Sequence, residues 1–188
     1  SMIFDLRRIS RDEENSLLQN SEDILFFLYG IEAEEPPRGF FQKLFGGKTP
    51  PKASRKWVEP AEDRVMSLDK NWHMIHYILA REPWEGTLPQ ATLLAGGEEL
   101  GSVDVGYGPA RLLSRSNVEE FAQYLGTLSK ENFAAGITAK EIAENELYGA
   151  YDEWSADDAM ALWEYIEEMR EFFSGAVKNN ECIILYLY

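Results

Sequence analysis

The sequence predicts a single α+β domain, in which a small mixed or antiparallel sheet packs with about five to six helices. Three observations support this prediction. Apolar segments typical of strands lie at residues 2–9 and 181–188, near the two ends of the chain. The long stretch between them carries repeated helix-capping signals. The 188 residues fit one domain, residues 1–188, and 45% of them are hydrophobic, which is enough to form a core.

The first predicted elements are a strand and two helices. Residues 2–9 are apolar and partly alternating, which favours a strand. Ser10 and Glu13 have the spacing of a capping box, so a helix is expected from there to about residue 19. A second helix is expected from Ser21 through the apolar run before Gly30, which should end it.

Residues 31–63 form, by prediction, an irregular Pro/Gly-rich insertion. Proline and glycine pairs interrupt any period, and the five basic residues between positions 43 and 56 make the segment locally basic. A short apolar turn is expected at Phe40, Phe41, Leu44 and Phe45. A connection this long inside one domain is usually functional or mobile. One hypothesis is that its basic residues contact the acidic C-terminal region.

A helix is predicted over residues 68–80, and a glycine-rich segment with short strands follows it. Leu68, Trp72, Ile75 and Leu79 would form one apolar stripe of that helix. The glycines between residues 96 and 109 indicate tight turns, and the best strand candidate of this segment is residues 110–113.

The C-terminal half is predicted to hold three further helices. Ser114 or Ser116 caps the first, whose inward residues include Val118 and Phe121, and Thr138 opens the second with a capping box. Ser155 opens the longest, with a buried stripe of Ala159, Leu162, Trp163, Ile166, Met169, Phe173 and Val177.

The closing segment, residues 181–188, is predicted to be a central strand of the sheet. It is apolar on both of its faces, as buried central strands are, and it would pair with the first strand. Cys182 lies in it and is expected to pack in the core. A lone cysteine cannot form an internal disulfide, which suits a reducing cytoplasm.

The charge of the chain bears on its partners. A formal net charge of −15 opposes binding to a nucleic-acid backbone, which depends on Lys and Arg. Residues 131–188 carry 13 acidic residues against 3 basic ones. This excess predicts either a well-solvated surface or a docking face for a basic protein partner. The residues proposed for that face are Glu164, Glu167, Glu168 and Glu171.

The sequence gives no sign of a membrane span or of a leader segment. No apolar run approaches 18 residues, and the N-terminus lacks a basic region followed by a hydrophobic one. We therefore expect a cytoplasmic protein without a membrane partner. Ser1 before Met2 is typical of a cleaved expression tag.

His73 and His76 are the only histidines, three residues apart on one predicted helix face. They allow a base, a ligand contact or a structural role. Asp69 lies one turn earlier and could orient His73. A metal site is not expected, because a pair of histidines without a third ligand is a weak zinc signal. No cofactor is expected either.

The glycine-rich run invites comparison with phosphate-binding loops, but the required spacing is missing. Neither GxxxxGK[ST] nor a GxGxxG between strand and helix is present. Arg111 could still bind a carboxylate or phosphate as an always-charged fork, and an internal partner such as Asp104 would serve equally. No GxSxG motif indicates a serine nucleophile.

Residues 68–79, LDKNWHMIHYIL, resemble the D-K-x-W-x-x-(I/L)-H-(Y/F)-x-L helix of the YfbM-like family. These are small bacterial proteins with a domain of unknown function. The YGPAR run at residues 107–111 and the pattern over residues 147–154 are also similar, although the Leu147-Tyr148-Gly149 stretch departs from the Ile-Tyr-Pro-like turn expected there. The resemblance covers most of the chain except residues 31–63.

This resemblance implies one α+β domain in the bacterial cytoplasm, and it brings no activity to transfer. Its recurring residues, Trp72, His76, Tyr107, Arg111 and Trp154, could form one shared cleft or a structural signature. Together with two neighbours they define a candidate pocket, whose members are Trp72, His73, His76, Tyr107, Arg111, Tyr148 and Trp154.

Two functional hypotheses follow. The leading one is a non-catalytic binding or interaction protein, of the immunity or inhibitor type, with an acidic face for a basic partner. The alternative is a small-anion pocket protein or enzyme that uses His76 and Arg111, with Trp72 and Tyr107 as walls. The alternative requires these four side chains to converge on one concave site that solvent can reach.

Overall fold

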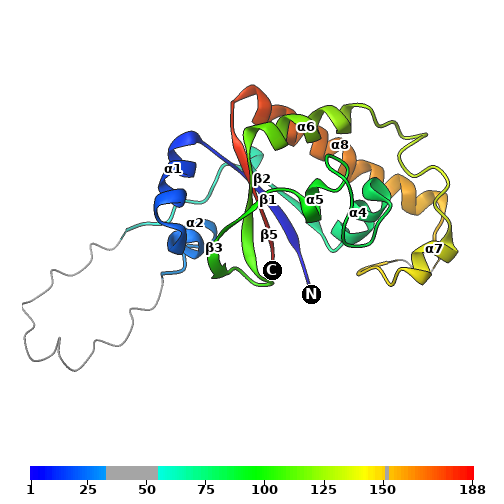
Figure 1. The fold of residues 1–188 in the computed structure, drawn as a ribbon, viewed down its shortest axis with the longest axis horizontal. Coiled ribbons are helices and arrows are strands. Elements are labelled where there is room, and N and C mark those ends of the chain that lie inside the picture. Colours follow the sequence, from blue (N-terminus) through cyan, green and yellow to red (C-terminus); the bar gives the residue numbers. More distant parts are fainter. Residues whose placement is uncertain (33–54, 151–152) are drawn as a thin grey trace, which may run out of the picture.

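A five-stranded antiparallel sheet forms the centre of the fold (Figure 1). The computed structural model describes residues 1–32, 55–150 and 153–188. The spatial order of the strands is β2-β1-β5-β4-β3. Their bounds are Phe4–Ile9 for β1, Val65–Asp69 for β2, Glu98–Asp104 for β3, Pro109–Leu113 for β4 and Cys182–Leu187 for β5. With helices on both faces of this sheet, the predicted α+β class is confirmed.

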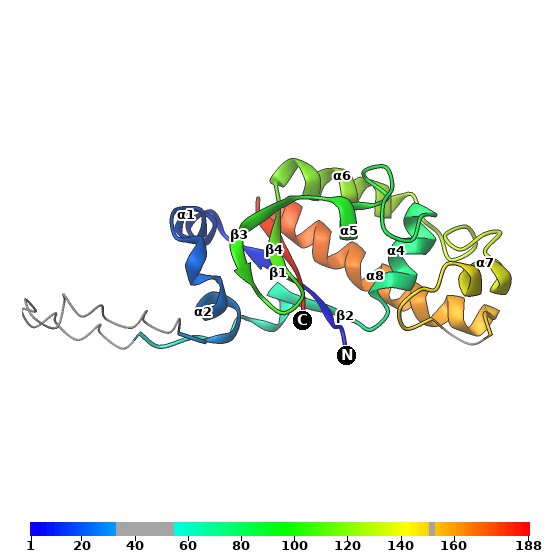
Figure 2. The ribbon, with the colours of Figure 1, turned by 60° about the horizontal axis from the view of Figure 1, so that its bottom comes forward.

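The central strand is β5, as the sequence predicted. It pairs antiparallel with β1, from Phe4 opposite Leu187 to Ile9 opposite Cys182, and with β4 on its other edge. Residues 182–186 are all buried, because each face of β5 lies under a hydrophobic core. The two strands at the ends of the described chain are therefore neighbours (Figure 2).

One face of the sheet is covered by α1 (Arg11–Gln19), the short 3-10 helix η1 (Ser21–Asp23) and α2 (Ile24–Tyr29). The predicted capping box is present, with the Ser10 hydroxyl accepting from the Glu13 amide and the Glu13 carboxylate accepting from the Ser10 amide. Gly30 ends α2 in the left-handed conformation at φ +72°. Together these helices bury a smaller core, which includes Ile9, Ile24, Leu28 and Ile184.

The other face carries the larger core and, in the part of the chain that the structure describes, five helices (Figure 1). They are α4 (Trp72–Ala80), α5 (Thr92–Ala95), α6 (Arg115–Gly126), α7 (Ala139–Glu144) and α8 (Ala156–Lys178). Ser114, one of the two residues predicted for this role, caps α6. Thr138 and Ser155 cap α7 and α8, as predicted. Within the described residues, none of the helices is both long and apolar enough to cross a membrane.

Two details of the prediction are wrong. Leu68 belongs to β2 and not to a helix, because Met66 and Leu68 alternate with exposed residues and Asp69, at φ +50°, ends the strand. The helix therefore begins four residues later, at Trp72. Val177 was assigned to the buried stripe of α8 but is 38% exposed, and Phe172 and Ala176 lie in the core instead.

Most of the predicted insertion, residues 33–54, lies outside the described residues, and so does the predicted apolar turn. Its described end places Arg55 beside α2. The Arg55 guanidinium pairs with Asp23 and Glu32 at 2.5 and 3.0 Å and lies 3.7 Å from the centroid of the Phe26 ring. This one basic residue therefore lies on the α2 side of the sheet, and α8 covers the opposite face (Figure 1).

Candidate functional site

Three of the predicted pocket residues, Trp72, His73 and Tyr148, lie together at the start of α4. The Trp72 ring centroid lies 5.0 Å from His73 and 5.5 Å from Tyr148, and Trp84 contacts His73 at 4.2 Å. Trp72 donates from Nε1 to the Met2 carbonyl at 3.2 Å, and the Tyr148 hydroxyl accepts from the Met2 amide at 2.8 Å. This aromatic cluster holds the start of the chain against α4.

His73 uses both ring nitrogens within the fold. Its Nδ1 accepts from the Tyr148 amide at 2.8 Å, and its Nε2 donates to the Pro83 carbonyl at 2.6 Å. These partners require the neutral tautomer with the proton on Nε2. Burial lowers the pKa of His73, which favours the same neutral form. The predicted orientation of His73 by Asp69 is wrong, because these two partners already fix the ring.

His76 is fully buried one turn further along α4. Its Nε2 donates to the Glu85 carbonyl at 3.1 Å, and its Nδ1 has no hydrogen-bond partner among the described residues. Burial, with a smaller contribution from the charge of Arg111, lowers the pKa of His76 to about 4. The imidazole is therefore neutral near pH 7 and has no proton to donate from Nδ1.

Arg111 lies near His76 and is bound by the backbone. Its guanidinium donates to the carbonyls of Leu93 and Gly96, which belong to the last turn of α5 and its C-cap. Carbonyls at a helix C-terminus lack partners within the helix, so Arg111 satisfies two acceptors that α5 leaves open. Burial lowers the pKa of Arg111 to about 10. Asp104, named above as a possible partner, instead accepts from the Gly106 and Gly108 amides.

The remaining two predicted pocket residues lie apart from this group. Tyr107 is 55% exposed in the turn between β3 and β4, where its amide donates to the Leu187 carbonyl at 3.0 Å. Trp154 is half-buried against the larger core, one residue before the cap of α8. The use of His76 and Arg111 by a small anionic ligand stays a prediction, and it would require His76 to leave a fully buried position.

The predicted acidic face lies on the exposed side of α8. Its four residues, spaced at i, i+3, i+4 and i+7, share one helix face and are all exposed: Glu164, Glu167, Glu168 and Glu171. Within the described part of the chain none of the four forms an ion pair. Three of them line a surface depression of about 420 Å³ together with Arg170. Arg170 itself donates to the Gly126 and Leu128 carbonyls.

Cys182 is buried, as predicted for a packing cysteine. Its thiol donates to the Glu14 carboxylate, which also binds Arg115 at 3.1 Å. Burial and the neighbouring carboxylate raise the pKa of the Cys182 thiol to about 12. A thiol that remains protonated is a poor nucleophile. Among the described residues, no group of three or more His, Cys, Asp or Glu is placed to hold a metal ion.

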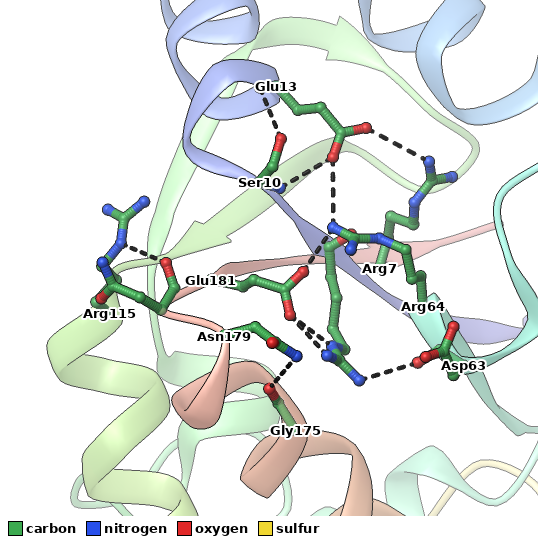
Figure 3. A network of polar contacts seen from close by, with 11 residues as sticks. Arg7, Ser10, Glu13, Asp63, Arg64, Arg115, Gly175, Asn179 and Glu181 are labelled. Carbon is green, nitrogen blue, oxygen red and sulfur yellow. Dashed lines mark hydrogen bonds and ion pairs between the residues drawn. The ribbon is translucent and has the colours of Figure 1, made fainter.

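Sequence reasoning missed a network of charged residues at one end of the sheet (Figure 3). Arg8 donates from Nε and Nη2 to one oxygen of Glu181, at 3.0 and 2.6 Å, and both side chains are buried. Arg64 pairs with the other oxygen of Glu181 at 2.5 Å. Arg8 also reaches over Gly175 of α8, where a Cβ would stand 2.6 Å from Nη1, so a larger residue there would displace the guanidinium.

Glu13 extends the network to the opposite face of the sheet. One of its oxygens lies 3.5 Å from Arg64, and the other lies 3.9 Å from Arg7 (Figure 3). Glu13 also accepts from the Ser10 amide at 2.9 Å, since it is part of the α1 capping box. The arginine network, defined as Arg7, Arg8, Glu13, Arg64 and Glu181, thus joins β1, α1, η2 (Glu62–Arg64) and the start of β5.

One sequence signal could have pointed to this network. Two adjacent arginines interrupt the apolar first strand, and consecutive strand residues point to opposite faces of a sheet. Because the residues around them are apolar, one arginine on each face of the strand must be buried or lie at an edge of the sheet. A buried charge needs a partner. Glu181, at the start of the apolar last strand, carries the matching signal.

The chain belongs to the family described as a domain of unknown function, DUF1877, whose model matches residues 1–186. The predicted resemblance to YfbM-like proteins is confirmed by a solved structure, titled as a protein of unknown function, YfbM, from Escherichia coli. That structure is 16% identical, superposes with a TM-score of 0.62 and covers 99% of both chains. At this identity the likeness establishes the fold. A search of the curated proteins gave no match.

Proposed function

We propose that this protein is a non-catalytic binding protein of the cytoplasm, which docks a basic protein partner on the acidic face of α8 as an immunity or inhibitor protein does. The observation that carries the proposal is the set of four exposed glutamates without an ion pair among the described residues. Like charges three and four residues apart destabilise a helix by about 0.2–0.5 kcal/mol per pair. These four glutamates reduce the stability of the helix and have no partner among the described residues. They therefore suit a partner on another protein.

The surroundings of the acidic face support a protein partner. Met160, one turn before Glu164, is 44% exposed and adds an apolar contact at the end of the same row. An acidic patch raises the rate of encounter with a basic protein through its long-range field. The chemically versatile side chains of the described core, His73, His76 and Cys182, are held neutral and bonded within the fold, which favours binding over catalysis.

The test compares two variants with the same change in charge. Replacing all four glutamates of the acidic face with glutamine removes four negative charges. Glu119→Lys with Glu120→Lys on the exposed side of α6 changes the net charge by the same amount. Each variant and the unmodified chain are used to capture partners from native lysate, with a low-salt wash before a high-salt wash.

The proposal expects a basic protein that the unmodified chain and the α6 variant retain, that the α8 variant loses, and that high salt releases. The proposal fails if no basic protein is retained, or if both variants lose the same protein equally. Equal loss would mean that the overall charge, and not the face of α8, determines binding.

A further inference from the structure

A cavity of about 560 Å³ opens beside β1 on the face of the sheet that α1 and α2 cover. Arg7 of β1 and Tyr186 of β5 provide its polar groups on the sheet. Leu28, Trp57 and Val65 provide apolar walls. A volume of this size suits a small organic ligand, and sites for such ligands combine apolar walls with polar groups that fix the orientation of the ligand.

Arg7 is a buried cation whose hydrogen-bonding capacity is unused. The residue is 6% exposed, and its Nε is buried without a hydrogen-bond partner. Among the described residues the guanidinium forms an ion pair with Glu13 at 3.9 Å, lies 4.7 Å from the centroid of the Phe27 ring and donates no hydrogen bond. A guanidinium carries five N–H donors, and burying them unpaired is costly. The Arg7 side chain lines the cavity.

The charges of the arginine network leave this cation uncompensated. The network holds three arginines and two glutamates, and Glu181 is taken by Arg8 and Arg64 (Figure 3). Glu13 is shared between Arg64, Arg7 and its own capping bond. Among these five residues one positive charge is in excess, and Arg7, with the longest of these contacts, is the one least neutralised by direct contact. An anion in the cavity would supply the missing charge.

Two neighbours of Arg7 do not neutralise it by direct contact. Asp5 lies two residues earlier on the same strand face, but within the described residues it forms no ion pair with Arg7, and its carboxylate accepts from the Tyr188 hydroxyl at 3.0 Å. Burial also raises the pKa of Asp5, which favours its neutral form. Tyr186 is held as a neutral phenol, because burial raises its pKa well above the usual value. A phenol that keeps its proton can donate it to a ligand oxygen.

The rim of the cavity limits the charge of the ligand. Glu59 and Glu62 line the opening, and both are exposed. Two carboxylates at the rim repel a phosphate dianion more strongly than a monoanion. Because Leu28, Trp57 and Val65 are apolar, the part of the ligand that packs against them should be uncharged. These features of the cavity match a ligand with one carboxylate on an apolar body.

We propose that this cavity binds a small organic monocarboxylate with an apolar body. The carboxylate takes the free donors of Arg7 and the hydroxyl of Tyr186, and the apolar part packs against Leu28, Trp57 and Val65. A planar guanidinium fork matches the two oxygens of a carboxylate, and this geometry is one that lysine cannot reproduce.

The experiment titrates the full chain with 3-phenylpropionate, with its uncharged amide and with inorganic phosphate. Binding is followed by calorimetry and by the NMR signal of the Trp57 indole N–H, which the structure places at the cavity wall. We expect saturable binding of the carboxylate at least about tenfold tighter than binding of the amide, because only the carboxylate is charged. Phosphate should bind more weakly than the carboxylate.

Four variants locate the site. Arg7→Lys should weaken carboxylate binding about tenfold or more, and Tyr186→Phe should weaken it several-fold. Ala61→Trp, at an exposed position of the rim, should block the cavity without touching the core, which keeps the test valid if Arg7→Lys does not fold. Arg11→Lys, on the exposed side of α1, is the matched control and should bind as the unmodified chain does.

Three results would overturn the proposal. The first is the absence of saturable carboxylate binding at millimolar concentration. The second is equal affinity for the carboxylate and the amide, or tighter binding of phosphate. The third is a carboxylate affinity that is unchanged both in the Ala61→Trp variant and in either Arg7→Lys or Tyr186→Phe. That result would place the bound carboxylate elsewhere on the chain.

Discussion

At the scale of single residues, several buried polar side chains stabilise the fold by binding backbone groups. His73, Arg111 and Tyr148 each hold backbone groups that secondary structure leaves open, at the loop after α4, the end of α5 and the start of the chain. The sequence motif that contains Trp72, His73 and His76 therefore has a structural explanation. These residues position backbone, and their burial makes the histidines poor bases.

The buried imidazole of His76 predicts a loss of stability in acid. Its pKa in the folded state is about 4, below the usual 6.5, so the unfolded chain binds the proton first as the pH falls. Stability is therefore lost as the pH falls from about 6.5 to about 4, and the loss should reach about 2 kcal/mol between pH 7 and pH 5.

The check is urea unfolding at both pH values for the unmodified chain and for His76→Gln. Glutamine does not titrate, so the variant should lose about 2 kcal/mol less between pH 7 and pH 5, whatever its stability at pH 7. Equal pH dependence of the two proteins would mean that His76 does not carry the effect.

At the scale of elements, capping signals located the helices more reliably than apolar periodicity did. The boxes at Ser10, Thr138 and Ser155 each mark a helix start in the structure. Periodicity alone placed Leu68 on a helix, because its spacing to Trp72 fits a helical stripe as well as the end of a strand. A short apolar run is ambiguous until the strand that pairs with it is known.

The cap of α8 predicts a defined loss when its side chain is removed. The Ser155 hydroxyl accepts from the Asp158 amide at 3.4 Å, and the Asp158 carboxylate accepts from the Ser155 amide at 2.8 Å. Ser155→Ala should lower the free energy of unfolding by about 1 kcal/mol, as measured by chemical denaturation. Ser174→Ala, at an exposed position inside the same helix, is the control and should cost nothing, since alanine is the better helix former.

At the scale of the whole molecule, the arginine network joins segments that are far apart in the chain. Arg8 and Glu181 are 173 positions apart, and Arg64 reaches the same carboxylate from η2. The sequence could predict the α+β class, the central position of β5 and the exposure of the acidic face. It could not predict which buried charges would meet, because such pairing depends on the register of β1 against β5 and on the path of the segment before β2.

Glu181→Gln tests how much this network contributes to the stability of the fold. The change keeps the shape of the side chain but leaves the buried guanidinium of Arg8 without its counter-charge, so the free energy of unfolding should fall by about 3–5 kcal/mol. Urea denaturation measures the loss. Glu119→Gln, exposed on α6, removes the same charge from the surface and should change stability by less than about 0.5 kcal/mol. A Glu181 variant as stable as this control would contradict the prediction.

The position of β5 has a consequence for how the chain reaches its native state. β1 pairs with β2, and β3 pairs with β4, but β5 follows all four in the chain and alone connects the two pairs. Until β5 has been synthesised, the β1–β2 pair and the β3–β4 pair remain separate two-stranded ribbons, and the inner edges of β1 and β4 are unpaired. Two-stranded ribbons are marginally stable in water, and open edges recruit strands from other molecules. The yield of folded protein should therefore fall as the concentration of nascent or refolding chains rises, because a neighbour's strand competes for the gap that β5 closes.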